Sequence, residues 1–406
     1  MNFIKKYKVH KYLEGGVLIY PDDSYLALNK AIIDAVFIII DVICKYNISL
    51  RDVLENIRDS EIKKGIMHIF NDLDINCNSI IITGDDSHYY PVQLSYEVTH
   101  RCNLKCRHCY IDKKSVNPKK EMNPQDFEIF LSKLDKYNLP LNIQITGGEP
   151  LLRKDIWDIL EIASFYAKDK WSFNTNGLLI NREIAETIDS YGPSMVAISL
   201  DGDKESHEFL RGRGTFEKTL NAIKIFNKYT NVDIEIDTMI TRKYPDTIER
   251  VKRVLQKEKI KYKKINYGFF MPVWGAKDAN LVKELLLLPS EFYGREYSKN
   301  KSIQFDYWEY KPSKEWNNHC SAGFYTYILD PYGNIFPCVV DRIKIFNMGN
   351  ILINDENYIF KNQARKYFSR KPLPDSACYM CPYNKLCKSC LVYQSAFCNR
   401  IGEFYG

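Results

Sequence analysis

The feature that most constrains the fold is a regular alternation of strand-like and helix-like segments between residues 92 and 270. Asn123-Pro124 and Asp155 mark helix starts, and Tyr191-Gly192-Pro193 marks a helix stop. Strands that alternate with helices pair in parallel through right-handed crossovers. The sequence therefore predicts an α/β fold whose six units suit an open, partial (β/α)6 barrel. The strand-like segments are 92–98, 141–146, 171–175, 194–200, 232–240 and 264–270, and the helix-like segments are 125–137, 155–168, 181–190, 215–229 and 246–259.

Three cysteines follow the first of these strands on one short stretch of chain. Cys102, Cys106 and Cys109 form a C-x3-C-x2-C triplet. Three thiolates on one loop can hold three irons of a 4Fe-4S cube and leave the fourth iron without a protein ligand. An open iron can accept a substrate or cofactor, so the triplet predicts a reactive cluster. The alternatives are buried reduced thiols or a zinc site, although zinc ribbons usually present C-x2-C pairs in twos.

The triplet and the turn after the second strand resemble the radical SAM family. Thr146-Gly147-Gly148-Glu149-Pro150 is similar to the family's glycine-glycine-glutamate-proline loop. Two glycines permit close backbone approach and positive φ, and carboxylate or carbonyl oxygens accept hydrogen bonds from an ammonium. The resemblance implies that S-adenosylmethionine chelates the fourth iron and that this loop receives the methionine amino group.

The resemblance also implies further cofactor contacts, all at the carboxyl ends of strands, where parallel α/β folds keep their chemistry. Ser199 is expected to contact the ribose or the carboxylate, and Arg211 is the natural cation for the methionine carboxylate. The expected contacts are His108, Gly147, Gly148, Glu149, Pro150, Asn174, Asn176, Ser199, Asp201 and Arg211.

A second group of cysteines lies beyond the barrel and resembles the SPASM extension, which carries auxiliary iron-sulfur clusters. The family's middle block is C-x2-C-x5-C-x3-C, whereas this chain has C-x2-C-x5-C-x2-C, one residue shorter. The resemblance implies two auxiliary clusters. Cys378, Cys381, Cys387 and Cys398 would close one of them, and Cys320, Cys338 and Cys390 would hold the other.

The second auxiliary set lacks a fourth cysteine, and two interpretations of this gap differ in function. Either His319, Asp341 or a water completes a site that only moves electrons, or the open iron takes a thiolate from the substrate. Structural zinc is the alternative for the whole block, although seven cysteines exceed one tetrahedral site and do not fill two.

The segment before the barrel, residues 1–85, has its own organisation. Three strand-like stretches, 7–12, 17–20 and 24–28, precede three helical stretches, 29–45, 49–58 and 60–72. This layout resembles the winged-helix recognition element that binds leader peptides and is often fused to peptide-modifying radical SAM enzymes. The alternative is an ordinary N-terminal extension packed on the barrel. The expected domains are thus 1–85 for leader recognition, 90–290 for the barrel and 315–406 for the auxiliary clusters.

Composition limits the remaining classes of function. The formal net charge of +6 is too small to indicate nucleic acid, and no stacking motif accompanies the lysine-rich stretches. The apolar stretch from Ala31 to Cys44 contains Asp34 and Asp41 and is too short to span a membrane. Twelve cysteines without a secretory signal indicate metal rather than disulfides in a cytoplasmic protein, with Cys44 and Cys77 expected as small buried apolar residues.

The resemblance implies a 5'-deoxyadenosyl radical that removes hydrogen from an unactivated carbon, with a flavodoxin- or ferredoxin-type protein as electron donor. Auxiliary clusters could accept the second electron of an oxidative modification. No unassigned cysteine lies in the barrel to donate hydrogen for an epimerisation. The sequence therefore favours a peptide maturase that joins sulfur to carbon in a thioether. Formylglycine formation, carbon-carbon crosslinking, and a non-catalytic peptide-binding module with structural clusters are the alternatives.

Overall fold

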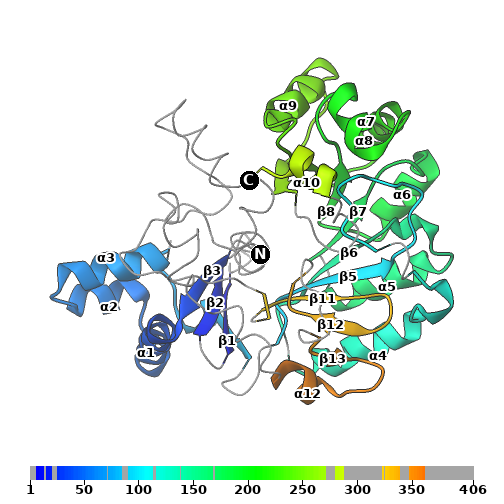
Figure 1. The fold of residues 1–406 in the computed structure, drawn as a ribbon. Helices are drawn as coiled ribbons and strands as arrows, with labels where there is room; N and C mark the ends of the chain where they lie inside the picture. Colours follow the sequence, from blue (N-terminus) through cyan, green and yellow to red (C-terminus); the bar gives the residue numbers. More distant parts are fainter. Residues whose placement is uncertain are drawn as a thin grey trace.

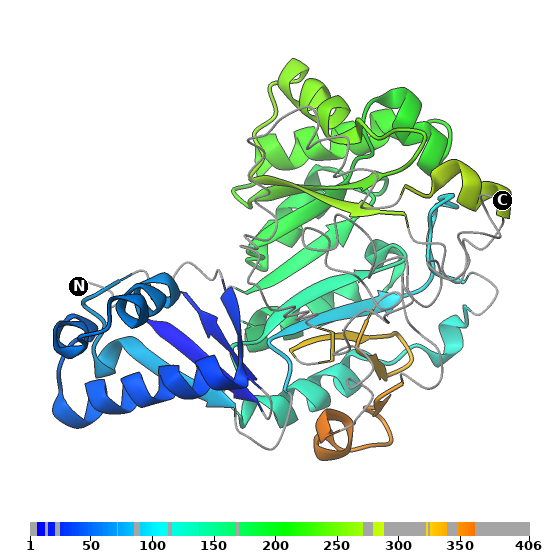
Figure 2. The same ribbon diagram turned by 60° about the vertical axis from the view of Figure 1, so that its left-hand side comes forward.

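A computed structural model shows the chain as a central sheet with helices on its outer side and a smaller domain at one end (Figures 1 and 2). The structure describes residues 6–12, 15–20, 25–70, 72–84, 90–112, 116–137, 139–167, 170–270, 279–287, 322–323, 325–338 and 347–361. No helix within these ranges is both long enough and apolar enough to cross a membrane.

Six parallel strands form the centre of the molecule in the order β10-β9-β8-β7-β6-β5. They confirm the α/β fold and the six strands expected from the sequence. The strands are β5 Gln93–Thr99, β6 Asn142–Gly147, β7 Trp171–Thr175, β8 Met195–Ser199, β9 Ile234–Ile240 and β10 Lys264–Phe269. The helices around them are α4 Pro124–Asp135, α5 Ile156–Ala167, α6 Arg182–Ser190, α7 Lys204–Arg211, α8 Phe216–Tyr229, α9 Thr247–Lys257 and α10 Ala279–Leu285, with short 3-10 turns η2 Pro118–Lys120 and η3 Pro150–Leu152.

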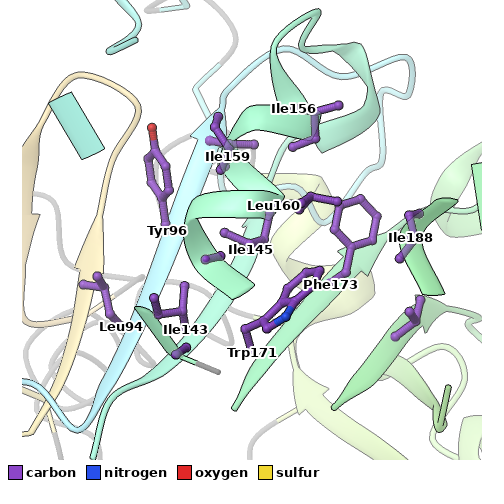
Figure 3. Close-up of a cluster of buried hydrophobic side chains, with 14 of the residues drawn as sticks. Leu94, Tyr96, Ile143, Ile145, Ile156, Ile159, Leu160, Trp171, Phe173 and Ile188 are labelled. Atoms are coloured by element: carbon purple, nitrogen blue, oxygen red, sulfur yellow. The ribbon is translucent and has the colours of Figure 1, made fainter. Parts of the chain in front are cut away.

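The sheet has one apolar face and one polar face because side chains alternate along each strand. The apolar face packs against the helices. Figure 3 shows Leu94, Tyr96, Ile143, Ile145, Trp171 and Phe173 of three strands meeting Ile156, Ile159 and Leu160 of α5. The opposite face carries polar residues such as Ser95, whose hydroxyl donates to Gln144 Oε1 at 2.8 Å. The barrel interior is therefore polar and suited to binding rather than to close apolar packing.

Three short strands after the barrel extend the same sheet beyond β5. β11 Thr326–Leu329 pairs in parallel with β5, and β12 Asn334–Phe336 and β13 Gly349–Asn350 follow antiparallel. The helix α12 Glu356–Lys361 then brings Phe360 against Tyr90, Phe130 and Tyr327. The beginning of the C-terminal region is thus part of the barrel's own core.

The N-terminal domain contains one strand more than the sequence predicts. Its elements are β1 Tyr7–Tyr12, β2 Gly15–Ile19, β3 Tyr25–Asn29, α1 Lys30–Tyr46, α2 Leu50–Asn56, α3 Ser60–Ile69, the 3-10 turn η1 Cys77–Ser79 and β4 Ile80–Gly84. The expected three-stranded sheet is wrong, because β4 pairs in parallel with β1 and makes four strands in the order β3-β2-β1-β4. The run Ile80-Ile81-Ile82-Thr83 is the β-branched signal for this strand.

One side of this small sheet packs against its helices, and the other side packs against the barrel. Val17 and Ile19 of β2 are buried against Val92 and Tyr325, next to the amino ends of β5 and β11. Figure 2 shows the domain at the end of β5 opposite to its arrowhead. A further strand could therefore join the small sheet only at its two edge strands, β3 and β4.

Two cysteines of this domain correct an expectation from the sequence. Cys44, in the last turn of α1, and Cys77, at the start of η1, form a disulfide, with their Cα atoms 4.8 Å apart. The sequence predicts them as separate small apolar residues in a chain whose cysteines bind metal. This prediction is wrong because η1 folds back beside the end of α1, a tertiary contact that the local sequence does not show.

Candidate functional site

The loop that carries the cysteine triplet leaves the carboxyl end of β5 and is held by three neighbouring segments. The first contact comes from the β6 turn, where the amides of Gly148 and Glu149 donate to the carbonyls of Thr99 at 2.7 Å and Arg101 at 2.8 Å. Asn176 Nδ2, after β7, donates to Asn103 Oδ1 at 2.8 Å. The third contact is the Arg107 amide, which donates to the carbonyl of Leu210 in α7 at 2.8 Å. These contacts fix the triplet at the edge where the parallel strands end.

The two glycines of the β6 turn are required by this packing. Gly147 has φ +134°, and a Cβ there would lie 2.4 Å from the Thr99 carbonyl oxygen. A Cβ on Gly148 would lie 2.1 Å from the Arg101 carbonyl oxygen. No larger residue fits without moving the loop. The glycines thus bring the β6 turn directly against the backbone that precedes Cys102.

Glu149 is fully buried, and its carboxylate accepts hydrogen bonds from neighbouring residues of the protein. Thr175 Oγ1 donates to Oε1 and the Asn176 amide donates to Oε2, each at 2.9 Å. The Glu149 side chain also accepts from the Leu151 amide and caps η3, which Pro150 begins. Glu149 therefore ties the β6 turn to the β7 turn, and Asn176 connects both to the cysteine loop.

The three thiols fit an iron-sulfur cluster. Cys102, Cys106 and Cys109 are partly exposed, and none forms a disulfide. Burial raises the pKa of the Cys106 thiol to about 11; Arg211 opposes this rise, and nearby Cys109 and Cys102 add to it. No three His, Cys, Asp or Glu side chains converge on one point within the described ranges. A four-iron cluster does not need such convergence, because each iron takes its own thiolate.

Arg211 and Asp201 form a buried ion pair behind the cysteine loop. Arg211 Nε donates to Asp201 Oδ2 at 2.6 Å, and the Met239 amide donates to Asp201 Oδ1 at 2.7 Å. Burial favours the neutral form of Asp201, but Arg211 and the neighbouring histidines hold its pKa below the ordinary value. Asp201 is thus an anion that orients Arg211, and Arg211 keeps other donors for a carboxylate.

His108 contributes an imidazole to the same place. Burial, and then Arg211, lower its pKa to about 4, so the ring is neutral near pH 7. Its Nδ1 is buried and has no hydrogen-bond partner among the residues that the structure describes. A buried polar atom without a partner is costly in a finished core, so it fits a site that still has a group to receive.

A pocket of about 270 Å³ opens beside this ion pair. It is lined by Arg211, Asp237, Thr238, Met239, Asn266, Tyr267 and Gly268. Residues from β9 and β10 were not expected in the site, although the alternation Ile234-Glu235-Ile236-Asp237 places carboxylates on one face of a buried strand. This alternation is the sequence signal that could have placed β9 in the site. The pocket connects the cation beside the triplet to the polar interior of the barrel.

Most of the expected site residues therefore come together at one edge of the sheet. The cysteine loop, which carries the triplet and His108, is surrounded by the β6 turn, Asn176, Asp201 and Arg211. Asn174 and Ser199 lie nearer the interior: Asn174 Nδ2 donates to Asp237 Oδ2 at 2.9 Å, and Ser199 is the residue of β8 that pairs with Asp237.

The auxiliary-cluster cysteines are mostly outside the described residues. Cys320, Cys378, Cys381, Cys387, Cys390 and Cys398 lie there, as do His319 and Asp341. Cys338 is described, and it follows β12 by two residues without forming a disulfide. Because β12 runs antiparallel to β11 and therefore to β5, it leads back toward the amino end of β5, away from the triplet.

Comparisons with protein families agree with this geometry. Residues 96–263 match the model of the Radical SAM superfamily, and residues 320–391 match the SPASM model, an iron-sulfur cluster-binding domain. The first match contains the triplet, the β6 turn and Arg211. The second contains Cys320, Cys338 and most of the later cysteines. These matches bear out S-adenosylmethionine, a 4Fe-4S cluster and auxiliary iron-sulfur clusters as the cofactors.

Three curated proteins illustrate the relationship. The chain is 24% identical over 309 residues to mycofactocin maturase MftC of Mycolicibacterium smegmatis, covering 73% of this chain and 77% of that protein. It is 26% identical over 329 residues to the subtilosin biosynthesis protein AlbA of Bacillus subtilis, covering 77% and 70%. It is also 29% identical over 197 residues to Fe-coproporphyrin III synthase of Methanosarcina barkeri, covering 48% of this chain and only 47% of that protein.

Among solved structures, Streptococcus suis SuiB bound to its precursor peptide SuiA has a similar fold. The TM-score is 0.60 at 18% identity, and the match covers 95% of this chain and 94% of that chain. The similarity therefore includes the N-terminal domain as well as the barrel and the C-terminal region.

Proposed function

Because the chain contains a radical SAM domain followed by a SPASM domain, we propose that it is a peptide maturase that oxidises a ribosomally made precursor. The observation that carries this proposal is the cysteine triplet, fixed by three segments at the polar end of the barrel beside a buried arginine. We propose that the domains are 1–85, 90–290 and 315–406.

The residues at the carboxyl edge have distinct roles in this proposal. Cys102, Cys106 and Cys109 hold the cluster, and Arg211 binds the methionine carboxylate while Asp201 orients it. When bound and reduced, the cluster and S-adenosylmethionine supply a 5'-deoxyadenosyl radical that removes a hydrogen atom from an unactivated carbon. The remaining cofactor contacts are proposed at His108, Gly147, Gly148, Glu149, Pro150, Asn174, Asn176 and Ser199. Glu149 would act through the backbone of its turn, because its carboxylate already accepts from Thr175 and Asn176.

A peptide is the favoured class of substrate. MftC is named a mycofactocin maturase, AlbA is named an antilisterial bacteriocin biosynthesis protein, and SuiB was solved with a precursor peptide. The sequence also matches AdoMet-dependent heme synthase of Methanosarcina barkeri, at 24% identity over 74% of this chain, so the extent of sequence similarity does not separate a peptide from a tetrapyrrole. A peptide is favoured because the match to SuiB, solved with its precursor peptide, covers 95% of this chain.

The proposed product is a thioether between a cysteine sulfur and a carbon of the peptide. The support is the set Cys320, Cys338 and Cys390, which lacks a fourth cysteine and could take a substrate thiolate. The C-terminal clusters would accept the second electron. Carbon-carbon crosslinking and formylglycine formation remain the alternative oxidations of the same site.

The N-terminal domain is proposed to hold the leader of the precursor as an added strand. Its sheet is covered by its own helices on one face and by the barrel at Val17 and Ile19 on the other, so the added strand must join at an edge. Tethering a leader raises the effective concentration of the core peptide to roughly millimolar for a short linker. A cytoplasmic flavodoxin- or ferredoxin-type protein is proposed as the electron donor.

The test is anaerobic turnover of reconstituted protein with dithionite, S-adenosylmethionine and a short cysteine-bearing precursor peptide, to be sought among the reading frames that neighbour this gene. We expect 5'-deoxyadenosine and a peptide that has lost two hydrogens and can no longer be alkylated at cysteine. An alkylatable product that has lost two hydrogens would indicate carbon-carbon crosslinking. Cys106→Ala should abolish both products while the C-terminal iron stays largely in place. Absence of 5'-deoxyadenosine from the parent protein would favour a non-catalytic peptide-binding module.

A further inference from the structure

We propose that Asp237 accepts the proton that the peptide loses during its oxidation. The inference rests on the proposed function, because it needs a peptide from which two hydrogens leave. It does not depend on the identity of the product, since the thioether and the carbon-carbon crosslink both release one proton in addition to the abstracted hydrogen atom.

Asp237 is held in one orientation by two amides from neighbouring strands. Asn174 Nδ2 of β7 donates to its Oδ2 at 2.9 Å, and Asn266 Nδ2 of β10 donates to its Oδ1 at 3.0 Å. Asn266 lies directly beside Asp237 in the sheet, whereas Asn174 must reach across β8. The residue of β8 level with Asn174 is Ala197, whose small side chain leaves room for this reach. Two amides fixing one carboxylate is the arrangement expected of a positioned base.

The carboxylate is presented to the pocket and not enclosed in the sheet. Asp237 and Arg211 line the same cavity of about 270 Å³, which also has Tyr267 and Gly268 in its wall. Each carboxylate oxygen accepts one amide hydrogen and has a further lone pair for a substrate donor. Burial raises the pKa of Asp237, with Glu235 adding to the rise and Asn266 opposing it, which makes this carboxylate a stronger base.

The other buried acids nearby are less suited to this role. Asp201 is committed to Arg211 and to the Met239 amide. Glu235 pairs in the ladder with Ala197, one level deeper toward the amino end of the strands, and accepts from Asn266 at 2.7 Å. Glu97 accepts from Tyr110 and contacts His100 on the far side of the barrel. Asp237 is the carboxylate that lines the pocket, among the residues that the structure describes.

The proposed step balances in atoms and electrons. A hydrogen atom first leaves a carbon of the peptide. The peptide thiol loses its proton to Asp237, which leaves the thiolate that the open iron could take, and formation of the sulfur-carbon bond then releases one electron. An auxiliary iron-sulfur cluster of the SPASM domain would be the oxidant that takes this electron. Removing the base leaves hydrogen abstraction possible but slows formation of the oxidised peptide.

The test measures two outcomes of the same turnover with the same precursor peptide, uniformly deuterated at carbon. Deuterium in 5'-deoxyadenosine counts hydrogen abstractions, and the mass of the peptide counts completed oxidations. For Asp237→Asn we expect the ratio of oxidised peptide to deuterated 5'-deoxyadenosine to fall about a hundredfold, the lower end of the range typical of a lost general base. Asp237→Glu should restore part of the ratio. A residue that only supports the fold would lower both counts together and leave their ratio unchanged.

The control is Asp233→Asn, at the opposite end of the same strand region, where Asp233 is half exposed and pairs with Lys263 at 2.7 Å. It should leave the ratio at the parent value. If Asp237→Asn fails to bind its cluster, Asn266→Ser serves instead, because it keeps the carboxylate but removes one amide, and should lower the ratio by a smaller factor. An unchanged ratio in a folded, cluster-loaded variant overturns the role of Asp237. A parent enzyme that oxidises no peptide overturns the proposed function instead.

Discussion

At the scale of single residues, the cysteine loop depends on the absence of a side chain at Gly148. A Cβ there would overlap the Arg101 carbonyl oxygen, which lies one residue before Cys102. We therefore expect Gly148→Ala to displace the loop and to lower both bound iron at the triplet and substrate-free cleavage of S-adenosylmethionine by more than tenfold. Iron analysis and 5'-deoxyadenosine formation measure these effects.

Gly65 provides the matched control for this substitution. It lies in α3, is exposed, and a Cβ there would have no heavy atom within 4 Å. Gly65→Ala should leave the cluster intact and stabilise the helix by about 0.5–1 kcal/mol, because alanine restricts the unfolded chain more than glycine does. Normal iron content in Gly148→Ala would show that the close approach is not needed.

Glu149 gives a prediction about pH. Burial raises its pKa to about 7, against an ordinary value of 4.5, while the donors Asn176, Thr175 and Leu151 oppose the rise. Between these values the folded chain keeps a proton that the unfolded chain has lost, so this residue makes stability fall as pH rises from about 4.5 to 7. The Glu149→Gln variant should lack this part of the pH dependence.

The same substitution has a cost that does not depend on pH. Glutamine offers one acceptor oxygen where the carboxylate offers two, so the donor from either Thr175 or Asn176 is left unsatisfied. We expect Glu149→Gln to be destabilised by about 1–3 kcal/mol at pH 5, where the parent keeps its proton, and by less at pH 8, where the parent has lost the stability that this proton contributes. Urea unfolding of the anaerobic protein at pH 5, 6, 7 and 8 separates the two effects. A slope against pH equal to that of the parent would contradict the titration of Glu149.

At the scale of elements, the sequence predicted the strands whose surroundings are simplest. All six barrel strands appear within two residues of the expected bounds, because buried parallel strands are short apolar runs between helices. The helix α7 was missed because Lys204–Arg211 contains mostly polar residues, and only Ser206, His207 and Leu210 are buried. Its importance comes from the tertiary contact that places Arg211 beside Asp201, which no local pattern shows.

The parts of the site that depend on the spacing of residues along the sequence were predictable. The parts that depend on the pairing register between strands were not. The triplet and the β6 turn are contiguous in sequence, so their spacing indicates their chemistry. The contact of Asn174 with Asp237 joins β7 to β9 across β8 and depends on the exact pairing of three strands. The Glu149 carboxylate is turned toward β7, so the expected contact of this loop with a cofactor ammonium stays a prediction for its carbonyl oxygens.

The disulfide between Cys44 and Cys77 leads to a prediction for the N-terminal elements. It joins α1 to the turn directly before β4 and closes a loop with a sequence separation of 33 residues. A loop of this size corresponds to about 3–4 kcal/mol of stabilisation in the chain-entropy description. We expect reduction, or Cys77→Ser, to speed hydrogen exchange at the amides of β4 while leaving β7 unchanged.

Hydrogen exchange with and without a thiol reductant measures this effect, and Cys77→Ser in the absence of reductant is the internal comparison. The reductant should have no effect on β4 in the variant. Equal exchange of β4 in oxidised and reduced parent protein would show that the disulfide contributes nothing to the edge of this sheet.

At the scale of the whole molecule, the cysteine triplet and the N-terminal domain lie at opposite ends of the same strand, β5. The triplet follows the carboxyl end of β5, whereas the N-terminal domain packs at its amino end through Val92. The beginning of the C-terminal region lies along the side of β5 through β11. A peptide held by the N-terminal domain must therefore pass along the molecule to reach the cluster, which favours a leader separated from the modified core by a flexible segment.

This arrangement predicts a specific effect of deleting residues 1–85. The truncated protein should bind the precursor more weakly and modify it more slowly, because tethering is lost, yet it should keep slow substrate-free cleavage of S-adenosylmethionine. Precursor affinity, product yield and 5'-deoxyadenosine are measured after confirming that the truncated barrel binds its cluster.

Deletion also uncovers Val92 and Tyr325, so a second variant must separate lost tethering from lost packing. Full-length Tyr325→Ser loosens the same contact but keeps the N-terminal domain, and it should retain precursor affinity within about threefold. If the loss of affinity is the same in both variants, packing explains it and the leader assignment fails. If a folded truncation binds and modifies the precursor as well as the full chain does, the N-terminal domain has no part in recognising the substrate. Tethering requires the truncated protein to bind more weakly and react more slowly, and repacking of the barrel could not restore a lost tether.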